Sequence, residues 1–304
     1  MKTQRTPIIK LKSQRFAHMK IWVKLEYFQD SGNIKMRVAQ ACIRKAEMEG
    51  KLVPFKGHTI IEASGGSMGV SLAGICARKG YKLKLVLPNN YNPERIRQLP
   101  VYGAEVLLSD YTLGNDSHFV LAKAIAQANP RHVYIDQLNN PANPEAHYLT
   151  TGAEIVTQLS SPDYFVSVVG SGGTISGAGR RIKEHYPQVK VVAVQPQGCD
   201  VIKGTAIPHK IQGTAVGLVP AVFNSGIVDQ VITVTYQEAM EMGHYLVTKE
   251  GLFLGISACA NIVAAEKLAG MVGYDKRIVT LAPDGGQIYL SHYLNYQNAH
   301  YGNY

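Results

Sequence analysis

The sequence lacks the features that mark disulfide-rich, zinc-binding or disordered proteins. Its four cysteines, Cys42, Cys76, Cys199 and Cys259, are widely spaced and form no CxxC pair and no cluster with histidine. This spacing suggests neither a disulfide framework nor a zinc site, and it suits a reducing cytoplasm. Only 17% of the residues are charged whereas 46% are hydrophobic, a composition that excludes intrinsic disorder.

Long apolar runs are also missing. The longest, such as Val166 to Val169 and Leu252 to Ile256, are far too short to cross a bilayer. The first residues, Met1 to Arg5, contain no apolar signal core. We therefore expect a soluble, cytoplasmic protein that makes no contact with a membrane.

Positive charge is in excess but dispersed. The 304 residues contain 31 Lys+Arg against 22 Asp+Glu, a formal net charge of +9. A basic patch interleaved with aromatic residues would indicate nucleic-acid binding. Here only the first residues form a basic run, so we expect no nucleic-acid partner and favour an anionic cofactor or substrate. The run consists of Lys2, Arg5, Lys10, Lys12, Arg15, Lys20 and Lys24.

Short β-branched segments alternate with longer segments of helical period. This alternation predicts an α/β fold built of right-handed βαβ units, and eight strands are many for one doubly wound sheet, so we expect two domains with mostly parallel sheets. Thr235 and Glu238 form a capping box before a helix at 239–247, and Asn92 caps a helix that starts with Pro93. The predicted strands are Thr59 to Glu62, Leu83 to Leu87, Glu105 to Leu108, Val133 to Asp136, Tyr164 to Val169, Val189 to Val194, Gln230 to Val234 and Ile278 to Leu281.

Two stretches share one design, in which an apolar strand leads through a glycine-rich turn into a helix. They are Thr59 to Cys76 and Tyr164 to Ile182. Ligands of parallel α/β folds bind outside the carboxyl ends of such strands. We therefore expect a cleft between the two halves of the molecule.

The turn Gly170-Ser171-Gly172-Gly173-Thr174 has the composition of a phosphate-binding loop. Its glycines let backbone N–H groups converge at the start of a helix, and two hydroxyls add donors. A dinucleotide fingerprint fails because Ile175 occupies the third glycine position, and no P-loop motif is present. A glycine turn that only packs strand against helix is the alternative.

The turn Ser64-Gly65-Gly66-Ser67-Met68-Gly69 makes the same transition in the first half. It suits a carboxylate held by backbone N–H groups and two serine hydroxyls. A tight turn with an N-capping serine explains the composition equally well.

Lys35 follows the strand-like segment Trp22 to Tyr27 and begins a helix that we expect to reach about Glu49. Positive potential from the helix start and from Arg37 favours the neutral, nucleophilic form of its amine. Taken alone, however, Lys35 is better explained as a solvated surface lysine.

In combination these motifs resemble, in order and over nearly the whole chain, the cysteine synthases and cystathionine β-synthases, which are fold-type II pyridoxal-phosphate enzymes. Lys35 is similar to their Schiff-base lysine, Ser64 to Gly69 to their substrate-carboxylate loop, and Gly170 to Thr174 to their phosphate loop. The other matching stretches are Thr6 to Leu11, Asn140 to Pro144 with His147, Thr150 to Gly152, Lys210 to Gly213, Gly255 to Ser257 and Pro283 to Gly286.

The resemblance implies pyridoxal 5'-phosphate as cofactor and a homodimer of two-domain subunits, with 41–144 as the smaller domain and 1–40 plus 145–304 as the larger. It implies β-elimination from a serine- or cysteine-derived amino acid followed by addition of a nucleophilic co-substrate, with Lys35 moving the α-proton. The implied cofactor-binding residues are Lys35, Ser67, Gly170, Ser171, Gly172, Gly173, Thr174 and Gly285, and the implied substrate-binding residues are Ser64, Gly65, Gly66, Ser67, Met68 and Gln137.

Several positions depart from the family pattern. Its carboxylate loop usually reads TSGNTG, but Ser67 replaces the asparagine and Met68 replaces a hydroxyl residue. Gly285 stands where a serine usually meets the pyridine nitrogen. Loss of one buried hydrogen bond costs about 1–3 kcal/mol, an amount that retunes binding rather than abolishing it. We therefore expect an enzyme that is specialised in its donor or acceptor. A methionine at position 68 that merely fills space is the alternative. The remaining departures are Met36, Ala258 and Cys259.

Two other functions stay open. An amino-acid dehydratase would use the same cofactor fold but protonate the product of elimination, and a non-catalytic family member would bind a partner through its basic first residues. We interpret His147 and His209 as structural rather than metal-binding, Cys259 as a buried inert thiol, and the carboxyl-terminal tyrosines as packing residues. These tyrosines are Tyr289, Tyr293, Tyr296, Tyr301 and Tyr304.

Overall fold

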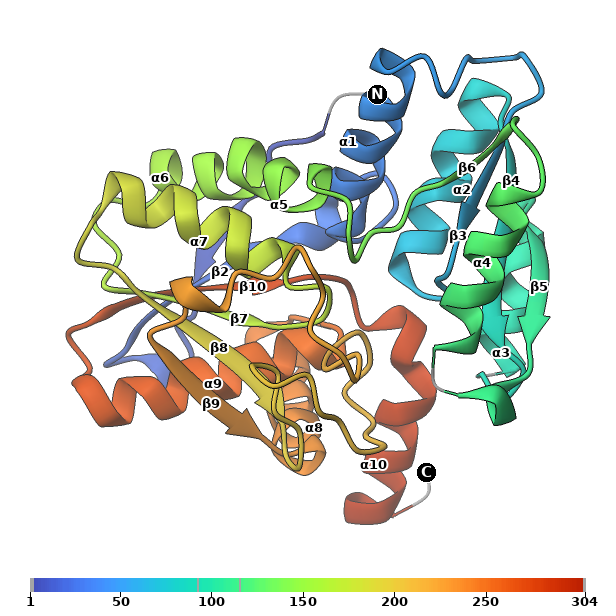
Figure 1. The fold of residues 1–304 in the computed structure, drawn as a ribbon. Helices are drawn as coiled ribbons and strands as arrows, with labels where there is room; N and C mark the ends of the chain where they lie inside the picture. Colours follow the sequence, from blue (N-terminus) through green and yellow to red (C-terminus); the bar gives the residue numbers. More distant parts are fainter. Residues whose placement is uncertain (1–2, 92, 115, 303–304) are drawn as a thin grey trace.

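The computed structural model describes residues 3–91, 93–114 and 116–302. The larger of its two sheets has the strand order β1-β2-β10-β7-β8-β9, and every pair is parallel except β1 with β2 (Figure 1). These strands come from the first 25 residues and from the second half of the chain, as β1 (Ile8–Lys10), β2 (Lys20–Leu25), β7 (Tyr164–Val168), β8 (Lys190–Pro196), β9 (Gln230–Val234) and β10 (Arg277–Ala282).

The smaller sheet is all parallel, with the order β5-β4-β3-β6. It contains β3 (Thr59–Glu62), β4 (Lys82–Pro88), β5 (Glu105–Ser109) and β6 (His132–Tyr134). Two mostly parallel sheets in an α/β chain confirm the predicted fold class. The predicted domain boundary between residues 40 and 41 falls inside a helix, and the division into domains stays a prediction.

Helices cover both faces of each sheet, because apolar residues fill both faces of the central strands. In β7, Phe165 contributes to the core under α6 (Ala153–Gln158) and α7 (Gly173–His185), whereas its neighbour Val166 belongs to the core under α8 (Tyr236–Tyr245) and α9 (Ile256–Val272). The smaller sheet packs against α1 (Lys35–Met48) and α2 (Ser67–Lys79) on one face and against α4 (Ser117–Gln127) on the other (Figure 1).

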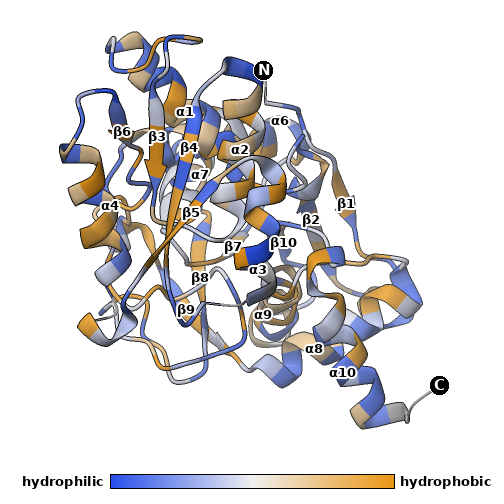
Figure 2. Ribbon diagram, turned by 90° about the vertical axis from the view of Figure 1, so that its right-hand side faces the viewer, coloured by the Kyte–Doolittle hydropathy of each residue, from blue (hydrophilic) through white to orange (hydrophobic). Residues whose placement is uncertain are grey.

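Three further helices complete the fold, namely α3 (Pro93–Gln98), α5 (Ala142–His147) and α10 (Leu290–Tyr301). In Figure 2 the strands β3, β4 and β5 are orange over part of their length, whereas α10 at the surface carries hydrophilic residues along much of its length. In the described parts of the chain, no helix combines the length and the apolar character that crossing a bilayer needs.

Most predicted strands agree with the structure to within one or two residues, and the differences have local causes. The strand predicted at Val133 to Asp136 ends at Tyr134, because Asp136 has a φ of 52° in the left-handed region. The segment predicted at Trp22 to Tyr27 is a strand only to Leu25 and then becomes a 3₁₀ turn. The strand Ile8–Lys10 was not predicted at all.

The capping predictions had mixed outcomes. Thr235 and Glu238 form the predicted capping box, but the helix that follows begins at Tyr236, three residues earlier than expected. The predicted N-capping serine before α2 is wrong, because Gly66 is the cap residue and Ser67 is already the first helical residue. Asn92, the other predicted cap, lies outside the described residues.

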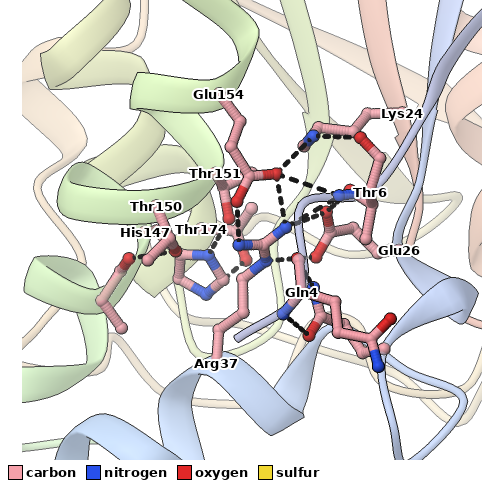
Figure 3. A network of polar contacts seen from close by, with 12 residues as sticks. Gln4, Thr6, Lys24, Glu26, Arg37, His147, Thr150, Thr151, Glu154 and Thr174 are labelled. Atoms are coloured by element: carbon pink, nitrogen blue, oxygen red, sulfur yellow. Dashed lines mark hydrogen bonds and ion pairs between the residues drawn. The ribbon is translucent and has the colours of Figure 1, made fainter. Parts of the chain in front are cut away.

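A buried charge network fixes helix α1 to the larger sheet (Figure 3). The guanidinium of Arg37, 1% exposed, makes paired contacts of 2.6 and 2.8 Å to the carboxylate of Glu26 and of 2.6 and 2.8 Å to that of Glu154. Lys24 adds a second cation, with its Nζ 2.7 Å from Glu154 and donating to the carbonyl of Thr6. Two cations thus balance two carboxylates, and the network joins β2, α1 and α6.

We expect Arg37→Ala to lower the free energy of unfolding by about 3–5 kcal/mol, because two buried carboxylates lose their main partner. Lys51→Ala, which breaks an exposed ion pair to Glu49, is the matched control and should cost less than about 1 kcal/mol. Urea unfolding followed by circular dichroism measures both values. Equal small losses in the two variants would contradict a structural role for the network.

Candidate active site

A cavity of about 400 Å³ lies between the two sheets. Its walls are the segments that follow the carboxyl ends of β3 and β4 in the smaller sheet and of β7 and β10 in the larger one. This is the position expected for a ligand of parallel α/β sheets. The predicted cleft between the two glycine-rich turns is therefore present.

Lys35 lines this cavity as the first residue of α1. Its backbone N–H donates to Asn33 Oδ1 over 2.9 Å, and its Nζ donates to Ser171 Oγ over 3.0 Å. The amine therefore points at the glycine-rich turn of the other sheet. The interpretation of Lys35 as a solvated surface lysine is wrong.

The environment of Lys35 favours its neutral form, as predicted, but for a different reason. Burial lowers the pKa of its amine to about 8, and the carboxylate of Glu62 partly opposes this shift. We had attributed the effect to the helix start and to Arg37. Arg37 instead turns away to bind Glu26 and Glu154, so desolvation is the principal cause.

Glu62 is a buried carboxyl group that the motifs did not point to. It ends strand β3, is 1% exposed, and accepts a hydrogen bond from Gln137 Nε2 over 3.2 Å. Burial, with a smaller contribution from Asp136, raises its pKa to about 8. A charged residue directly after the apolar pair Ile60-Ile61 was the only sequence signal for it.

The turn Gly170 to Thr174 forms a cradle that leaves no room for larger side chains. A Cβ on Gly170 would collide with the carbonyl oxygen of Gly213, and one on Gly173 would collide with Asn143 Oδ1. Gly172 has a φ of 78° and lies against the ring of Phe223. The glycines therefore allow other segments to approach the turn closely. All members of the turn except Gly173 also line the cavity, so the turn does more than pack a strand against a helix.

Asn143 connects this turn to Gln137. It is fully buried, and its Nδ2 donates to the carbonyl of Gln137 over 2.7 Å and to Ser171 Oγ over 3.1 Å. Ser171 Oγ thus accepts from both Lys35 and Asn143, which leaves its own proton available to a group in the cavity. Sequence reasoning had noted the stretch Asn140 to Pro144 without a role for Asn143.

The other glycine-rich turn, Ser64 to Met68, forms the wall contributed by the smaller sheet. Space at Gly65 is taken by Leu87 and Tyr91, whose side-chain atoms lie 2.5 and 2.6 Å from where a Cβ would be. Met68 is 1% exposed and belongs to the core of the smaller sheet while also lining the cavity. Gln137 lines the cavity as well, so all predicted substrate-binding residues face the same space.

Gly285, a predicted cofactor-binding residue, does not line the cavity, so its contact with the cofactor stays a prediction. It pairs with Leu254 through an isolated bridge, and the side chain of Gln287 fills the space where a Cβ would be. Its neighbours Pro283 and Asp284 line the cavity instead.

Residues that we had discounted, or had not named, also form the wall. Tyr289 lines the cavity and donates to Asp284 Oδ2 over 2.8 Å, and Ser67 Oγ lies 3.5 Å from the same oxygen. His118 and Phe119 at the start of α4 were not predicted, and nothing in their local sequence indicated them. Further lining residues not named in advance are Tyr91 and Val216.

The remaining expectations concern thiols and histidines. Cys259 is fully buried, as predicted, and burial raises the pKa of its thiol to about 12, which disfavours the reactive thiolate. Over residues 3–91, 93–114 and 116–302, His, Cys, Asp and Glu form no group of three that could hold a metal ion.

Comparison with known proteins agrees with this geometry. The family model described as pyridoxal-phosphate dependent enzyme matches residues 1–284. A cysteine synthase of Staphylococcus aureus is 40% identical over 292 residues, which cover 94% of this chain and 93% of that protein. An O-ureido-L-serine synthase of Streptomyces lavendulae is 33% identical over 293 residues, 95% of this chain and 90% of its own.

Solved structures give the same result. The crystal structure of O-ureido-L-serine synthase superimposes with a TM-score of 0.89 at 33% identity and covers 94% of this chain and 91% of its own. That of a hydrogen sulfide-producing enzyme from Fusobacterium nucleatum has a TM-score of 0.86 at 35% identity, with 93% and 96% covered.

The cavity fits pyridoxal phosphate by its own chemistry. It holds one desolvated lysine amine for the aldehyde, and a glycine cradle with the hydroxyls of Ser171 and Thr174 at a helix start for the phosphate. The amine and the cradle touch, since Lys35 Nζ and Ser171 Oγ are 3.0 Å apart.

We expect the rate at which the apoprotein takes up pyridoxal phosphate to rise with pH around a midpoint near 8, because the neutral amine is the reactive form and its pKa is lowered to about 8. In Glu62→Gln the midpoint should move to lower pH, since the carboxylate that raises the pKa of Lys35 is gone. Glu49→Gln, at the exposed end of α1, is the control and should not shift it. Stopped-flow absorbance at a series of pH values gives the midpoints, and one near 10.5 would refute the buried amine.

Gly173→Ala should weaken binding of pyridoxal phosphate and lower stability by about 1–3 kcal/mol, because the added methyl displaces Asn143 from Ser171. The matched change Gly270→Ala lies in helix α9 with open space around it and should be neutral or stabilising by up to about 1 kcal/mol. Equilibrium dialysis and thermal unfolding measure the two effects. Unchanged affinity in Gly173→Ala would show that the cradle tolerates a side chain.

Proposed function

The chain belongs to the family of pyridoxal-phosphate-dependent enzymes and is a cysteine synthase-like enzyme of β-replacement, and from this premise we propose which residues carry the reaction and which substrates it takes. The donor is a serine- or cysteine-derived amino acid such as O-acetylserine, O-phosphoserine or cysteine. The second substrate is a nucleophile that adds at the β-carbon after the leaving group has departed.

The observation that carries this assignment is the meeting of three groups in one cavity. The amine of Lys35 lies 3.0 Å from Ser171 Oγ in the glycine cradle, and the turn Ser64 to Met68 lies on the opposite wall. The amine binds the cofactor aldehyde, the cradle binds its phosphate, and the opposite turn holds the carboxylate of the amino acid.

Each residue has a definite task in this arrangement. Pyridoxal phosphate, when bound, supplies an electron-withdrawing ring that stabilises negative charge on the substrate α-carbon. Lys35 Nζ removes the α-proton, a task suited to an amine whose pKa is lowered to about 8. Gln137, held on Glu62, donates its remaining amide proton to the substrate carboxylate, and the hydrophobic wall of Met68, Leu87 and Tyr91 excludes water.

The substituted positions support a specialised donor or acceptor. Ser67 has a shorter side chain than the asparagine of the family pattern, and its hydroxyl faces Asp284 at 3.5 Å. Met68 offers a thioether where the pattern has a hydroxyl, so it donates no hydrogen bond to the substrate. We propose that these two positions, with Tyr91 and His118 on the same wall, select the substrate.

The assembly and location follow the family resemblance. We propose a homodimer in the cytoplasm, with 41–144 as the smaller domain and 1–40 plus 145–304 as the larger. The smaller domain would then carry the substrate turn Ser64 to Met68, and the cofactor cradle would belong to the larger one.

The test offers purified enzyme O-acetylserine, O-phosphoserine and serine, each with sulfide, and cysteine with a different thiol as nucleophile, and identifies products by mass spectrometry. At least one donor should give the β-substituted amino acid, and Lys35→Ala should reduce turnover about 10²- to 10⁴-fold, the contribution typical of a general acid–base group. Lys45→Ala, on the exposed side of the same helix, is the matched control and should keep its activity.

Two other outcomes would overturn the proposal. Release of a keto acid with no trapped nucleophile would make the protein a dehydratase. Full turnover in Lys35→Ala would show that the amine of Lys35 takes no part in the reaction.

A further inference from the structure

His147 is a fully buried histidine behind the phosphate cradle. It ends helix α5, with Nδ1 2.9 Å from Thr151 Oγ1 and Nε2 3.2 Å from Thr174 Oγ1 (Figure 3). Thr174 is the second residue of α7 and lines the cavity, whereas His147 does not. The imidazole therefore reaches the site only through the hydroxyl of Thr174.

Close helix packing brings His147 into this position. A Cβ on Gly177 of α7 would collide with the carbonyl oxygen of Pro144 and would come within 3.0 Å of the Cβ of His147. A Cβ on Gly152, at the end of the π-helical turn Tyr148–Gly152, would lie 2.7 Å from the Cβ of Arg181 and 3.0 Å from the Cα of Ala178 in the same helix α7. These two glycines let α5 and the turn after it approach the helix that starts at the cradle.

The imidazole is neutral in this place. Burial places the pKa of His147 well below its ordinary value, and the nearby cations Lys35 and Arg37 lower it further. A neutral imidazole has one N–H donor and one acceptor nitrogen, and the partner on each side decides which is which. The two threonine hydroxyls can satisfy either arrangement.

An anion in the cradle removes this freedom. A phosphate dianion only accepts hydrogen bonds, so the Thr174 hydroxyl can bind it only by donating its proton. The hydroxyl oxygen must then accept from His147, which requires the proton on Nε2. Nδ1 must accept in turn, and Thr151 has the hydroxyl that donates to it.

We propose that His147 is a positioning residue that holds the Thr174 hydroxyl as a donor to the cofactor phosphate, in a chain running from Thr151 through Nδ1 and Nε2–H to Thr174. The proposal rests on the proposed place of the phosphate at residues 170–174, and it does not depend on which β-substituent is replaced. His147 touches neither cofactor nor substrate.

The test compares binding of pyridoxal phosphate with binding of pyridoxal, which has the same aldehyde for Lys35 but no phosphate. His147→Phe and Thr174→Val should each weaken binding of pyridoxal phosphate by about 10- to 100-fold and leave pyridoxal within about twofold, because one hydrogen bond to a charged group is lost. His132→Phe in strand β6, whose Nδ1 contacts the carbonyl of Ile125, is the control and should leave the ratio of the two affinities unchanged.

The double variant His147→Phe/Thr174→Val should bind pyridoxal phosphate no more weakly than Thr174→Val alone, since both changes remove the same bond. Nitrogen NMR of the wild-type holoenzyme should show the His147 proton on Nε2, a measurement that does not depend on the folding of any variant.

Equal losses of affinity for both ligands would mean that His147 has a merely structural role. Additive losses of affinity in the double variant, or a proton on Nδ1, would refute the proposed chain of hydrogen bonds. If the donor panel gives no β-replacement but these binding results hold, the proposed function fails while this inference stands. If Thr174→Val leaves binding of pyridoxal phosphate unchanged while the donor panel gives β-replacement, the Thr174 hydroxyl does not bind the phosphate, and the inference fails while the proposed function stands.

Discussion

The paired contacts of Arg37 determine where the reactive amine lies. Lys35 and Arg37 are two residues apart on the first turn of α1, so their side chains leave the helix in different directions. Arg37 is held by two carboxylates from the larger sheet side, Glu26 and Glu154. The helix also packs against the smaller sheet. The guanidinium fixes its first turn to the other half, together with the bridge between Asn33 and Asp284 and the hydrogen bond from the Ile34 N–H to the carbonyl of Pro283. Lys35 consequently reaches Ser171 across the boundary between the sheets.

Desolvation gives the site its chemistry. The same burial that lowers the pKa of Lys35 to about 8 raises that of Glu62 to about 8 and keeps His147 neutral. Arg37 is buried as deeply but stays charged, because two carboxylates bind it with good geometry. The buried ionisable groups thus fall into two sets. In the network that holds α1, opposite charges pair with one another. Around the cofactor site, Lys35, Glu62 and His147 have fewer charged partners, and burial shifts their pKa values.

Sequence patterns predicted the parts of the fold that depend on local preferences. In the described part of the chain the β-branched runs located eight strands, β3 to β10, the strand-like segment Trp22 to Tyr27 located β2, and the glycine turns located both walls of the cavity. Ile8–Lys10 was missed because three residues give no periodicity, and the end of β6 was missed because the left-handed φ of Asp136 has no sequence marker in a non-glycine residue. Glu62 and His118 could not be found, since their importance comes from which elements surround them.

Helix α5 shows why a sequence motif can be visible while its purpose is not. Asn143 and His147 lie four residues apart and therefore on one face of the helix, where the first contacts Ser171 and the second contacts Thr174. One rigid face thus supports both hydroxyl residues of the phosphate turn. The approach is possible because glycines 173 and 177 present no side chain to α5. Polar residues at 143 and 147 and glycines at 173 and 177 are consequently needed together for α5 to pack against the start of α7. The sequence alone shows each spacing but not the contact between them.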